Sequence, residues 1–241
     1  MTTLVLGDTG ATGRLLVEQL LQRGHAVKAM ARSPDRLPEP VRNHERLSVI
    51  HASVLDLDDA QLVEHVTDCQ AVASCLGHNL TWKGVFGSPR RLVTDATRRV
   101  CEVVKATDPQ TPVRFVLMNS AGNRNRDLNE RVSLGQRCVI GLFRLLLPPH
   151  ADNEHAADYL RTELGRRDEG IEWVAVRPDS LIDEEAVSRY EVHPSPTRSA
   201  IFNPGSISRI NVAHFMAELI ADDPTWRRWV GRMPVIYNRD E

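Results

Sequence analysis

Three features are scarce in this sequence: cysteine, long apolar runs and an excess of charge of one sign. The 241 residues include only four cysteines, at positions 69, 75, 101 and 138, with no CxxC pair and no metal-type spacing. We interpret them as small apolar residues in a reduced compartment. A formal net charge of −2 gives no general attraction to nucleic acid or to acidic membranes, so neither is an expected partner.

The hydrophobic pattern excludes a transmembrane segment, because no run approaches the roughly 18 apolar residues that a membrane-spanning helix needs. The chain opens directly on the apolar run Thr3-Leu4-Val5-Leu6, without the charged start, long apolar stretch and cleavage site of a signal peptide. These two observations predict a soluble, cytoplasmic protein.

Strand and helix signals alternate along the first half of the chain. Apolar runs predict strands at 4–6, 26–31, 47–51, 71–75 and 113–118, and helical spacing predicts helices at 11–23, 57–66 and 89–106. Strands this apolar are typical of a parallel sheet covered by helices on both faces. The alternation therefore predicts an α/β fold with a doubly wound, mostly parallel sheet and right-handed crossovers.

The second half is less regular. A long insertion at 127–147 ends in a strongly apolar segment, and Pro148-Pro149 is expected to terminate it. A helix at 153–167, a strand at 171–176, a polar, proline-bearing stretch at 183–204, a helix at 211–221 and a strand at 234–237 are predicted to follow. For the apolar segment 139–147 three roles remain open: packing beside the sheet, a lid over a hydrophobic substrate, or a dimer or membrane-surface contact.

The most informative motif is the glycine turn Gly7-Asp8-Thr9-Gly10-Ala11-Thr12-Gly13. Such a string is weak evidence by itself, but here it follows the first strand at once and opens an amphipathic helix. Gly7 would allow the sharp turn, Gly10 the approach of a pyrophosphate, and Gly13 close packing of helix on strand. The helix N-terminus then offers N–H groups to the phosphates. We therefore predict a Rossmann-type nucleotide site; no Gly-Lys-Ser/Thr follows, so it is not an NTPase loop.

The end of the second predicted strand bears on the choice of cofactor. Sites for NAD usually carry an acid there, whereas this chain has Arg32-Ser33, and a guanidinium with a hydroxyl suits the 2′-phosphate of NADP. We therefore predict NADP(H), with NAD(H) as the less favoured cofactor. Asp56, after the third strand, has two open roles: accepting a hydrogen bond from the adenine amino group, or capping a helix.

Several stretches together resemble a known family. They are GDTGATGRLLVEQLLQRGHAVKAMARSP, VLMNSAG, AADYLRTEL, GIEWVAVRP and SISRINVAHFMAELIADDPTW, and they span nearly the whole chain. The chain is similar to the atypical short-chain dehydrogenases/reductases, in the NAD(P)H-binding group of NmrA-like and biliverdin/flavin reductase type. The first stretch is specific for fold and cofactor, and the others only in combination.

The resemblance implies a single NAD(P)-binding Rossmann domain over residues 1–241. Its dinucleotide-binding core would span about 1–122, with substrate or lid elements at about 123–150 and 179–210. It also adds cofactor contacts after the fourth, fifth and sixth strands. With those from the motif, the predicted cofactor-binding residues are Gly7, Thr9, Gly10, Ala11, Thr12, Gly13, Arg32, Ser33, Asp56, Leu57, Cys75, Leu76, Gly77, Asn119, Ser120, Asn153, Arg177 and Pro178.

The sequence departs from the family at the catalytic pair. The best-known branch uses a Tyr with a Lys four residues later, but the residue four after Tyr159 is Glu163, and no YxxxK occurs. The resemblance aligns Asn153 with a position where relatives often carry Lys or His, and an amide cannot act as a general acid. The predicted catalytic residues are Ser120, Asn153 and His155, and His155 has the alternative of a half-exposed surface histidine. His78 and Asn79 are further candidates at the pocket mouth.

We therefore expect hydride transfer from the nicotinamide to a small aromatic, flavin or quinone-like acceptor, with protonation from solvent. One alternative is a non-catalytic NADP(H) sensor of NmrA-like type that binds a protein partner. A second is an epimerase-like enzyme, which normally needs the Tyr-Lys pair. The sequence does not identify the substrate, and a homodimer remains open.

Overall fold

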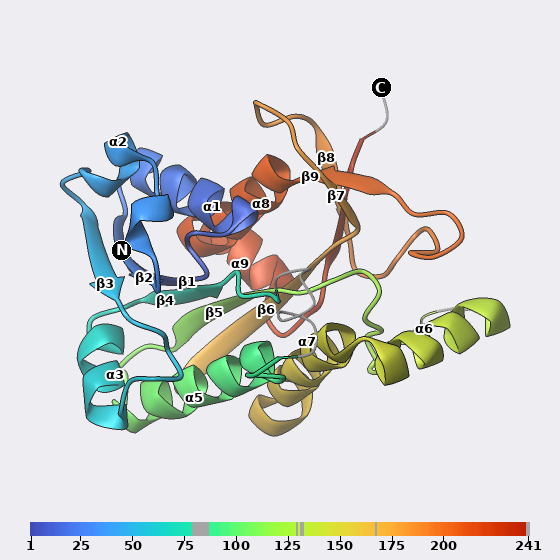
Figure 1. The fold of residues 1–241 in the computed structure, drawn as a ribbon, viewed down its shortest axis with the longest axis horizontal. Coiled ribbons are helices and arrows are strands. Elements are labelled where there is room, and N and C mark those ends of the chain that lie inside the picture. Colours follow the sequence, from blue (N-terminus) through green and yellow to red (C-terminus); the bar gives the residue numbers. More distant parts are fainter. Residues whose placement is uncertain (79–86, 129, 131–132, 167, 240–241) are drawn as a thin grey trace.

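The computed structural model describes residues 1–78, 87–128, 130, 133–166 and 168–239. An eight-stranded sheet with the order β3-β2-β1-β4-β5-β6-β10-β8 runs through the molecule (Figure 1). Its pairs are parallel except for the β8–β10 pair, which is antiparallel. The order of the first six strands is that of a doubly wound Rossmann sheet, which confirms the predicted fold class. The strands are β1 (Thr2–Leu6), β2 (Ala26–Ala31), β3 (Leu47–His51), β4 (Ala71–Ser74), β5 (Val113–Met118), β6 (Ile171–Pro178), β8 (Tyr190–His193) and β10 (Val235–Asn238).

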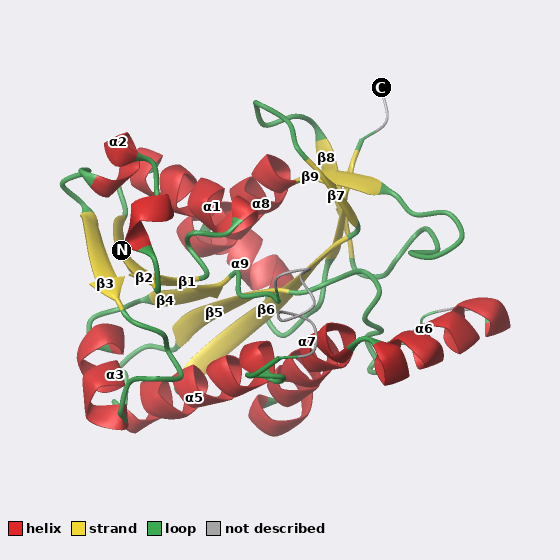
Figure 2. Cartoon of the chain, viewed as in Figure 1, coloured by secondary structure: helices red, strands yellow, loops and turns green. Residues whose placement is uncertain are grey.

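Helices cover both faces of the sheet, as Figure 2 shows. One face carries α1 (Ala11–Gln22), α8 (Arg209–Ala221) and α9 (Asp223–Trp229), and the other carries α3 (Asp59–Val66), α5 (Leu92–Ala106) and α7 (Pro148–Tyr159). A π-helical turn, Leu160–Leu164, extends α7. Most apolar strand residues belong to two core clusters, one under each helical layer, as expected for a sheet buried on both sides. Val235 and Tyr237 of β10 pack with Ala121 in a small third cluster.

The α7 helix is tied to the N-terminus of α5 by a buried carboxylate. Asp152 accepts hydrogen bonds from the backbone N–H groups of Val93 and Thr94, at 2.8 and 3.0 Å. No α5 residue caps that end, so the acid supplies the missing acceptor from a neighbouring helix. This contact fixes α7 beside the sheet, close to the end of β5.

The second half departs from the sequence expectations at two points. Pro148 and Pro149 begin α7 rather than only ending the apolar segment, because proline suits the first turn of a helix, where no N–H partner is needed. The polar stretch 183–204 contains β8, an edge strand that pairs with β10. The other elements are the 3₁₀ turn η1 (Pro34–Arg36), the short helix α2 (Glu39–Arg42), the longer helix α6 (Leu134–Leu146) and the strand pair β7 (Ser180–Ile182) and β9 (Ser206–Ser208).

The apolar segment forms most of α6, which extends from the body of the molecule beside α7 (Figure 1). Ile140 is buried, whereas Leu142 and Leu146 are 52% and 53% exposed. Of the side chains in this segment that the structure describes, Ile140 packs inward and Leu142 and Leu146 are exposed. Among the described residues, no helix combines the length and hydropathy needed to cross a membrane.

Candidate cofactor and acceptor site

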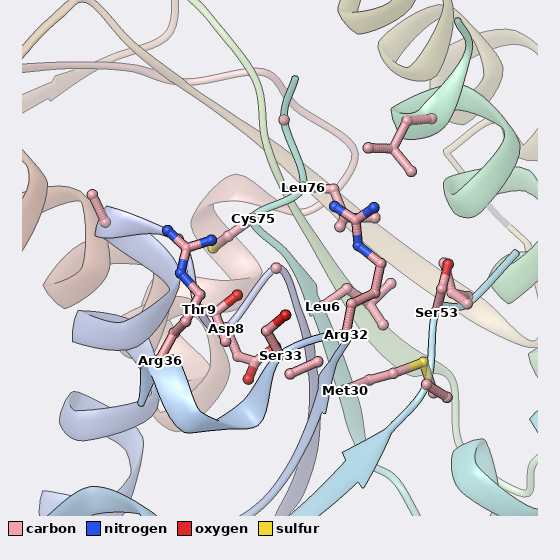
Figure 3. A pocket seen from close by; sticks show the side chains of 18 residues that line it. Leu6, Asp8, Thr9, Met30, Arg32, Ser33, Arg36, Ser53, Cys75 and Leu76 are labelled. Carbon is pink, nitrogen blue, oxygen red and sulfur yellow. The ribbon is translucent and has the colours of Figure 1, made fainter. Parts of the chain in front are cut away.

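A pocket of about 410 Å³ opens where β1, β2, β3 and β4 end (Figure 3). This edge, where the strand order turns from β1 to β4, is where doubly wound sheets bind ligands. Four segments form the walls of the pocket: the glycine turn, the end of β2, the residues after β3 and the residues after β4. The lining residues are Leu6, Gly7, Asp8, Thr9, Gly10, Ala11, Met30, Ala31, Arg32, Ser33, Arg36, Ala52, Ser53, Val54, Cys75, Leu76, Gly77 and Leu92.

The glycine turn has the geometry that its sequence requires. Gly7 has φ +76°, and a Cβ there would lie 2.7 Å from the backbone of Cys75, so only glycine fits. A Cβ on Gly13 would lie 2.1 Å from the carbonyl oxygen of Gly7. Because Gly13 has no side chain, the first turn of α1 packs directly on the glycine turn. The N-terminal end of α1 therefore lies at the pocket.

The N-terminus of α1 faces this pocket without a side-chain cap. Its N-cap residue is Gly10, and no described side chain bonds to the first N–H groups of the helix. Uncapped N–H groups and the positive end of the helix dipole favour an anionic ligand. The turn is therefore suited to a phosphate group, and both Gly10 and Ala11 line the pocket.

Two arginines line the pocket beyond the end of β2. Arg32 and Arg36 both present guanidinium groups there, with Ser33 between them (Figure 3). Neither forms an ion pair with any other residue that the structure describes. Arg36 was not among the predicted residues, because it lies five residues past β2, in a short 3₁₀ turn that the sequence did not predict.

Asp8 is a further pocket residue that sequence reasoning did not assign. Its side chain is fully buried, and neither carboxylate oxygen has a hydrogen-bond partner among the described residues. Burial raises the pKa of Asp8 to about 6, and the nearby backbone amides of Asp8 and Thr9 only partly offset that effect. A buried carboxyl group beside an anion site is most compatible with its ligand when it is protonated.

The structure places several predicted cofactor residues outside this lining. Asp56 is exposed, and the N-cap of α3 is Asp58, whose side chain accepts from Gln61 N at 2.8 Å. The chain passes the pocket earlier, at Ala52, Ser53 and Val54, so the wall expected from Asp56 and Leu57 comes from these residues. Thr12 and Gly13 lie behind the turn, within the first turn of α1.

A second pocket of about 270 Å³ lies past the end of β5 and includes Ser120. The ring of His150, on α7, faces the same space: a methyl group on Gly122 would lie 3.5 Å from both Ser120 Oγ and His150 Cε1. Burial lowers the pKa of His150; Arg144 lowers it further, and Glu154 opposes both. Ser120 Oγ accepts a hydrogen bond from Gly122 N at 3.2 Å. The other lining residues are Ile140, Asp179, Ser180, Ala200 and Ile201.

Sequence reasoning chose Asn153 and His155 on α7, whereas the structure presents His150 to the pocket. His155 is exposed and Asn153 is half-buried, and neither lines either pocket. The Asn153 side-chain amide donates to Pro149 O at 3.1 Å, and the backbone carbonyl oxygen of Asn153 accepts from Asn119 Nδ2 at 2.8 Å. Asn119 and Asn153 thus join the end of β5 to α7, and they position Ser120 and His150 without facing the space between them.

Arg177 and Pro178, at the end of β6, are buried. The Arg177 guanidinium pairs with Glu130 at 2.8 Å and also donates to the carbonyl oxygen of Asn123 at 2.8 Å. Its donors are therefore committed to the protein interior. Pro178 O accepts from Ala121 N at 2.8 Å. Both residues shape the loop after β5, and neither lines a pocket described above.

The further candidate His78, and Tyr159, the tyrosine that lacks a partner lysine, both have structural contacts. The His78 Nε2 lies 2.8 Å from Asp152 Oδ2, the same carboxylate that caps α5, and the His78 side chain is buried. Tyr159 is buried in the core beneath the Arg98 guanidinium, and burial raises the pKa of its phenol. Asn79 lies outside the described residues.

Comparison with known proteins agrees with this geometry. Residues 7–223 match the protein family described as NAD(P)H-binding. The chain belongs to the NAD(P)H-binding family. This confirms the resemblance to atypical short-chain dehydrogenases/reductases that the sequence indicated.

Individual relatives of this NAD(P)H-binding protein are distant. It is 28% identical over 225 residues, 91% of the chain and 71% of the relative, to an uncharacterized chloroplastic protein of Arabidopsis thaliana. A Veillonella parvula short-chain dehydrogenase/reductase in complex with NADP has a TM-score of 0.70 at 16% identity, covering 98% of this chain and 94% of the other. A candidate NADH-flavin reductase of Streptococcus pneumoniae has a TM-score of 0.67 at 18% identity, covering 99% and 100%. The two structures share the fold.

Proposed function

We propose that this protein is an NADP(H)-dependent oxidoreductase that passes hydride to a small aromatic, flavin or quinone-like acceptor without a Tyr-Lys pair. The observation that carries the proposal is the pocket between an uncapped helix N-terminus and the Arg32-Ser33-Arg36 group. The helix N-terminus suits a pyrophosphate. The guanidinium and hydroxyl groups after β2 suit a 2′-phosphate, which an acidic side chain at that position would repel. The description of one structural neighbour as a complex with NADP and of another as an NADH-flavin reductase supports the reaction class.

In this proposal the chain's residues bind and orient the reactants. The backbone N–H group of Ala11 would hold the pyrophosphate, since that of Gly10 donates to the Gly7 carbonyl oxygen at 3.0 Å. The residues from Cys75 to Gly77 would border the adenosine side. A bound nicotinamide would supply the hydride. Ser120 and His150 would border the acceptor; the hydroxyl can donate a hydrogen bond to an acceptor oxygen or nitrogen, and a neutral imidazole can orient it.

The central experiment measures cofactor binding and turnover separately. Isothermal titration with NADPH and NADH should show saturable binding of both, with NADPH tighter by about tenfold or more because of its extra phosphate. Oxidation of NADPH should then be followed at the nicotinamide absorbance band with a panel of flavins and quinones. Turnover of at least one acceptor is the expected result.

Two contrary results have different meanings. Tight NADPH binding with no turnover on the panel would favour the sensor alternative over the oxidoreductase. Absence of saturable binding of either dinucleotide by folded protein would exclude both functions. A cytoplasmic location is a further proposal, supported by the buried free thiols of Cys69, Cys75 and Cys101.

A further inference from the structure

Asp8 contributes an acid to the lining of the cofactor pocket, within the turn that is suited to phosphate groups (Figure 3). The residue is 0% exposed, and neither carboxylate oxygen has a hydrogen-bond partner among the described residues. A buried carboxylate is normally held by a cation or by hydrogen-bond donors, because its ionised form loses its hydration on burial. Asp8 therefore has the surroundings of a carboxyl group whose proton depends on what occupies the pocket.

The groups around Asp8 leave its charge uncompensated. On β4, burial and then the charge of Asp8 raise the pKa of the Cys75 thiol to about 12, so this neighbour stays neutral. On α8, Met216 contacts Cys75 and carries no charge. Arg32 and Arg36 line the same pocket, but no ion pair joins either of them to Asp8 among the described residues. Only backbone amides of the glycine turn oppose the effect of burial on the Asp8 carboxyl group.

A bound dinucleotide changes this balance in one direction. Without it, burial raises the pKa of Asp8 to about 6, so the carboxyl group is ionised at pH 7 by a margin of only about one pH unit. The pyrophosphate would bring two negative charges to the N-terminus of α1, next to the same turn, and would displace water from the pocket. A like charge nearby and the loss of water both disfavour an ionised carboxyl group. Each effect raises the pKa of Asp8 further.

We propose that Asp8 is a proton-binding residue of the cofactor site: its carboxyl group takes up a proton from solvent when the dinucleotide binds and returns it when the dinucleotide leaves. The inference rests on the dinucleotide binding of the proposed function and is independent of hydride transfer. By linkage, affinity for the dinucleotide falls as the pH rises from the pKa of Asp8 in the free protein to its higher value in the complex. Cofactor release is therefore favoured at alkaline pH.

The number of protons taken up on binding tests this inference. NADH is the probe, because it lacks the 2′-phosphate, which itself titrates at about pH 6. Isothermal titration at pH 7 in two buffers of different ionisation enthalpy should show uptake of about half a proton or more per NADH bound. In Asp8→Asn the uptake should fall by about that amount. Glu18→Gln is the matched control and should retain it, because Glu18 is a partly buried carboxyl group with a raised pKa on α1 that does not line the pocket.

The pH dependence of affinity is a second readout. Between pH 6.5 and 8 the dissociation constant of NADH should rise by about threefold to tenfold more in the wild type than in Asp8→Asn. Protons taken up by other groups, such as the His51 imidazole whose Nε2 lies 3.0 Å from Arg32 O, are common to both proteins and cancel in this comparison.

A third measurement needs no substitution and applies even if Asp8→Asn fails to fold. In protein labelled with carbon-13, the Asp8 carboxyl resonance, assigned through its own backbone, reports the protonation of that group. Its titration midpoint should move upward by about one pH unit or more when NADH is added. An unchanged midpoint would overturn the inference.

Failure of the inference and failure of the proposed function give different results. Saturable NADH binding without proton uptake, or with equal uptake in the wild type and Asp8→Asn, overturns the role of Asp8 and leaves the proposed function standing. Absence of saturable binding by folded protein overturns both. Binding with proton uptake but without turnover on any acceptor supports the role of Asp8 and counts against the oxidoreductase.

Discussion

Arg177 and Glu130 form a two-point ion pair in the protein interior, with N–O distances of 2.8 and 3.2 Å and exposures of 0% and 3%. The pair joins the end of β6 to the loop that leaves β5. The same guanidinium donates to the carbonyl oxygens of Met233 and Asn123, each at 2.8 Å. Because every donor direction is used, the acceptor-side loop is held to the sheet by a buried polar network.

Removing one partner of this pair should be strongly destabilising. Arg177→Met would leave the Glu130 carboxylate buried and uncompensated, at an expected cost of about 3–5 kcal/mol in the free energy of unfolding. Urea denaturation followed by circular dichroism measures it. Arg126→Ala, which breaks an exposed pair, is the control and should cost less than about 1 kcal/mol. Similar losses in both variants would contradict a structural role for the buried pair.

Arg32 and Arg36 should together determine the cofactor preference. Arg32→Ala and Arg36→Ala are each expected to weaken NADPH binding by about tenfold or more while changing NADH binding little, since only NADPH carries the 2′-phosphate. Arg42→Ala serves as control, because Arg42 pairs with Asp35 and does not line the pocket. Titration calorimetry gives the ratio of dissociation constants, and equal losses for both cofactors would show that neither arginine contacts the phosphate.

Asp8 should make the protein less stable as the pH rises. Its folded-state pKa is about 6, above the ordinary value of 3.8, so the folded state binds more protons between these two values. The contribution of Asp8 to stability is therefore greatest below pH 4, falls through this window and levels off above pH 6, with a total change of about 2–3 kcal/mol. Asp8→Asn should remove this component.

The measurement is urea unfolding of the wild type and Asp8→Asn at several pH values between 4 and 7.5. The difference in unfolding free energy between them should grow with pH. A difference that stays constant across the series would contradict the raised pKa. Because Asp8 lies beside the phosphate site, the variant should also bind NADPH more tightly at pH 7.5.

Gly13 should not tolerate a side chain. In Gly13→Ala the new Cβ would collide with the Gly7 carbonyl oxygen, 2.1 Å away, and must push α1 off the loop. We expect a loss of about 3 kcal/mol or more in stability, and NADPH binding weakened in parallel. In Gly141→Ala, within α6, the Cβ meets no described atom within 4 Å, and the melting temperature should stay within a few degrees of the wild type. Equal melting temperatures for the two variants would mean that the turn is looser than described.

His150 should affect turnover more than cofactor binding. His150→Gln is expected to lower kcat by about tenfold or more, with the dissociation constant of NADPH unchanged, because the ring faces the acceptor pocket and does not line the cofactor pocket. His155→Gln is the matched control, as that histidine is exposed on the same helix. Stopped-flow kinetics and a binding titration separate the two effects; identical kcat values for both variants would rule out His150.

The cofactor half of the molecule could be predicted from sequence because local rules determine it. The strands β2, β3 and β5 lie at the residues that apolar runs indicated, and the turn from Gly7 to Gly13 has a fixed relation to strand and helix. Arg36 and Asp8 were not predicted as site residues, for two different reasons. Arg36 depends on a 3₁₀ turn with little sequence signal, and the burial of Asp8 depends on tertiary packing.

The acceptor half could not be predicted in the same way, because residues distant in sequence build it. The edge strand β8 is half-exposed and polar, so it lacks the apolar pattern that identified the buried strands. His150 was passed over because the helix was expected to begin at Asn153, whereas α7 begins at Pro148. An error of five residues at a helix start changed which side chain was assigned to the site.

The residues from 195 to 203 are attached to the sheet region at both ends and nowhere contribute to the cofactor pocket. Before them β8 is hydrogen-bonded to β10, and after them β9 is hydrogen-bonded to β7. Such an attachment lets this loop accept insertions, deletions or substitutions while the phosphate-binding turn stays in place. Under the proposed function, a change of acceptor preference by evolution or redesign is therefore expected to begin at this loop.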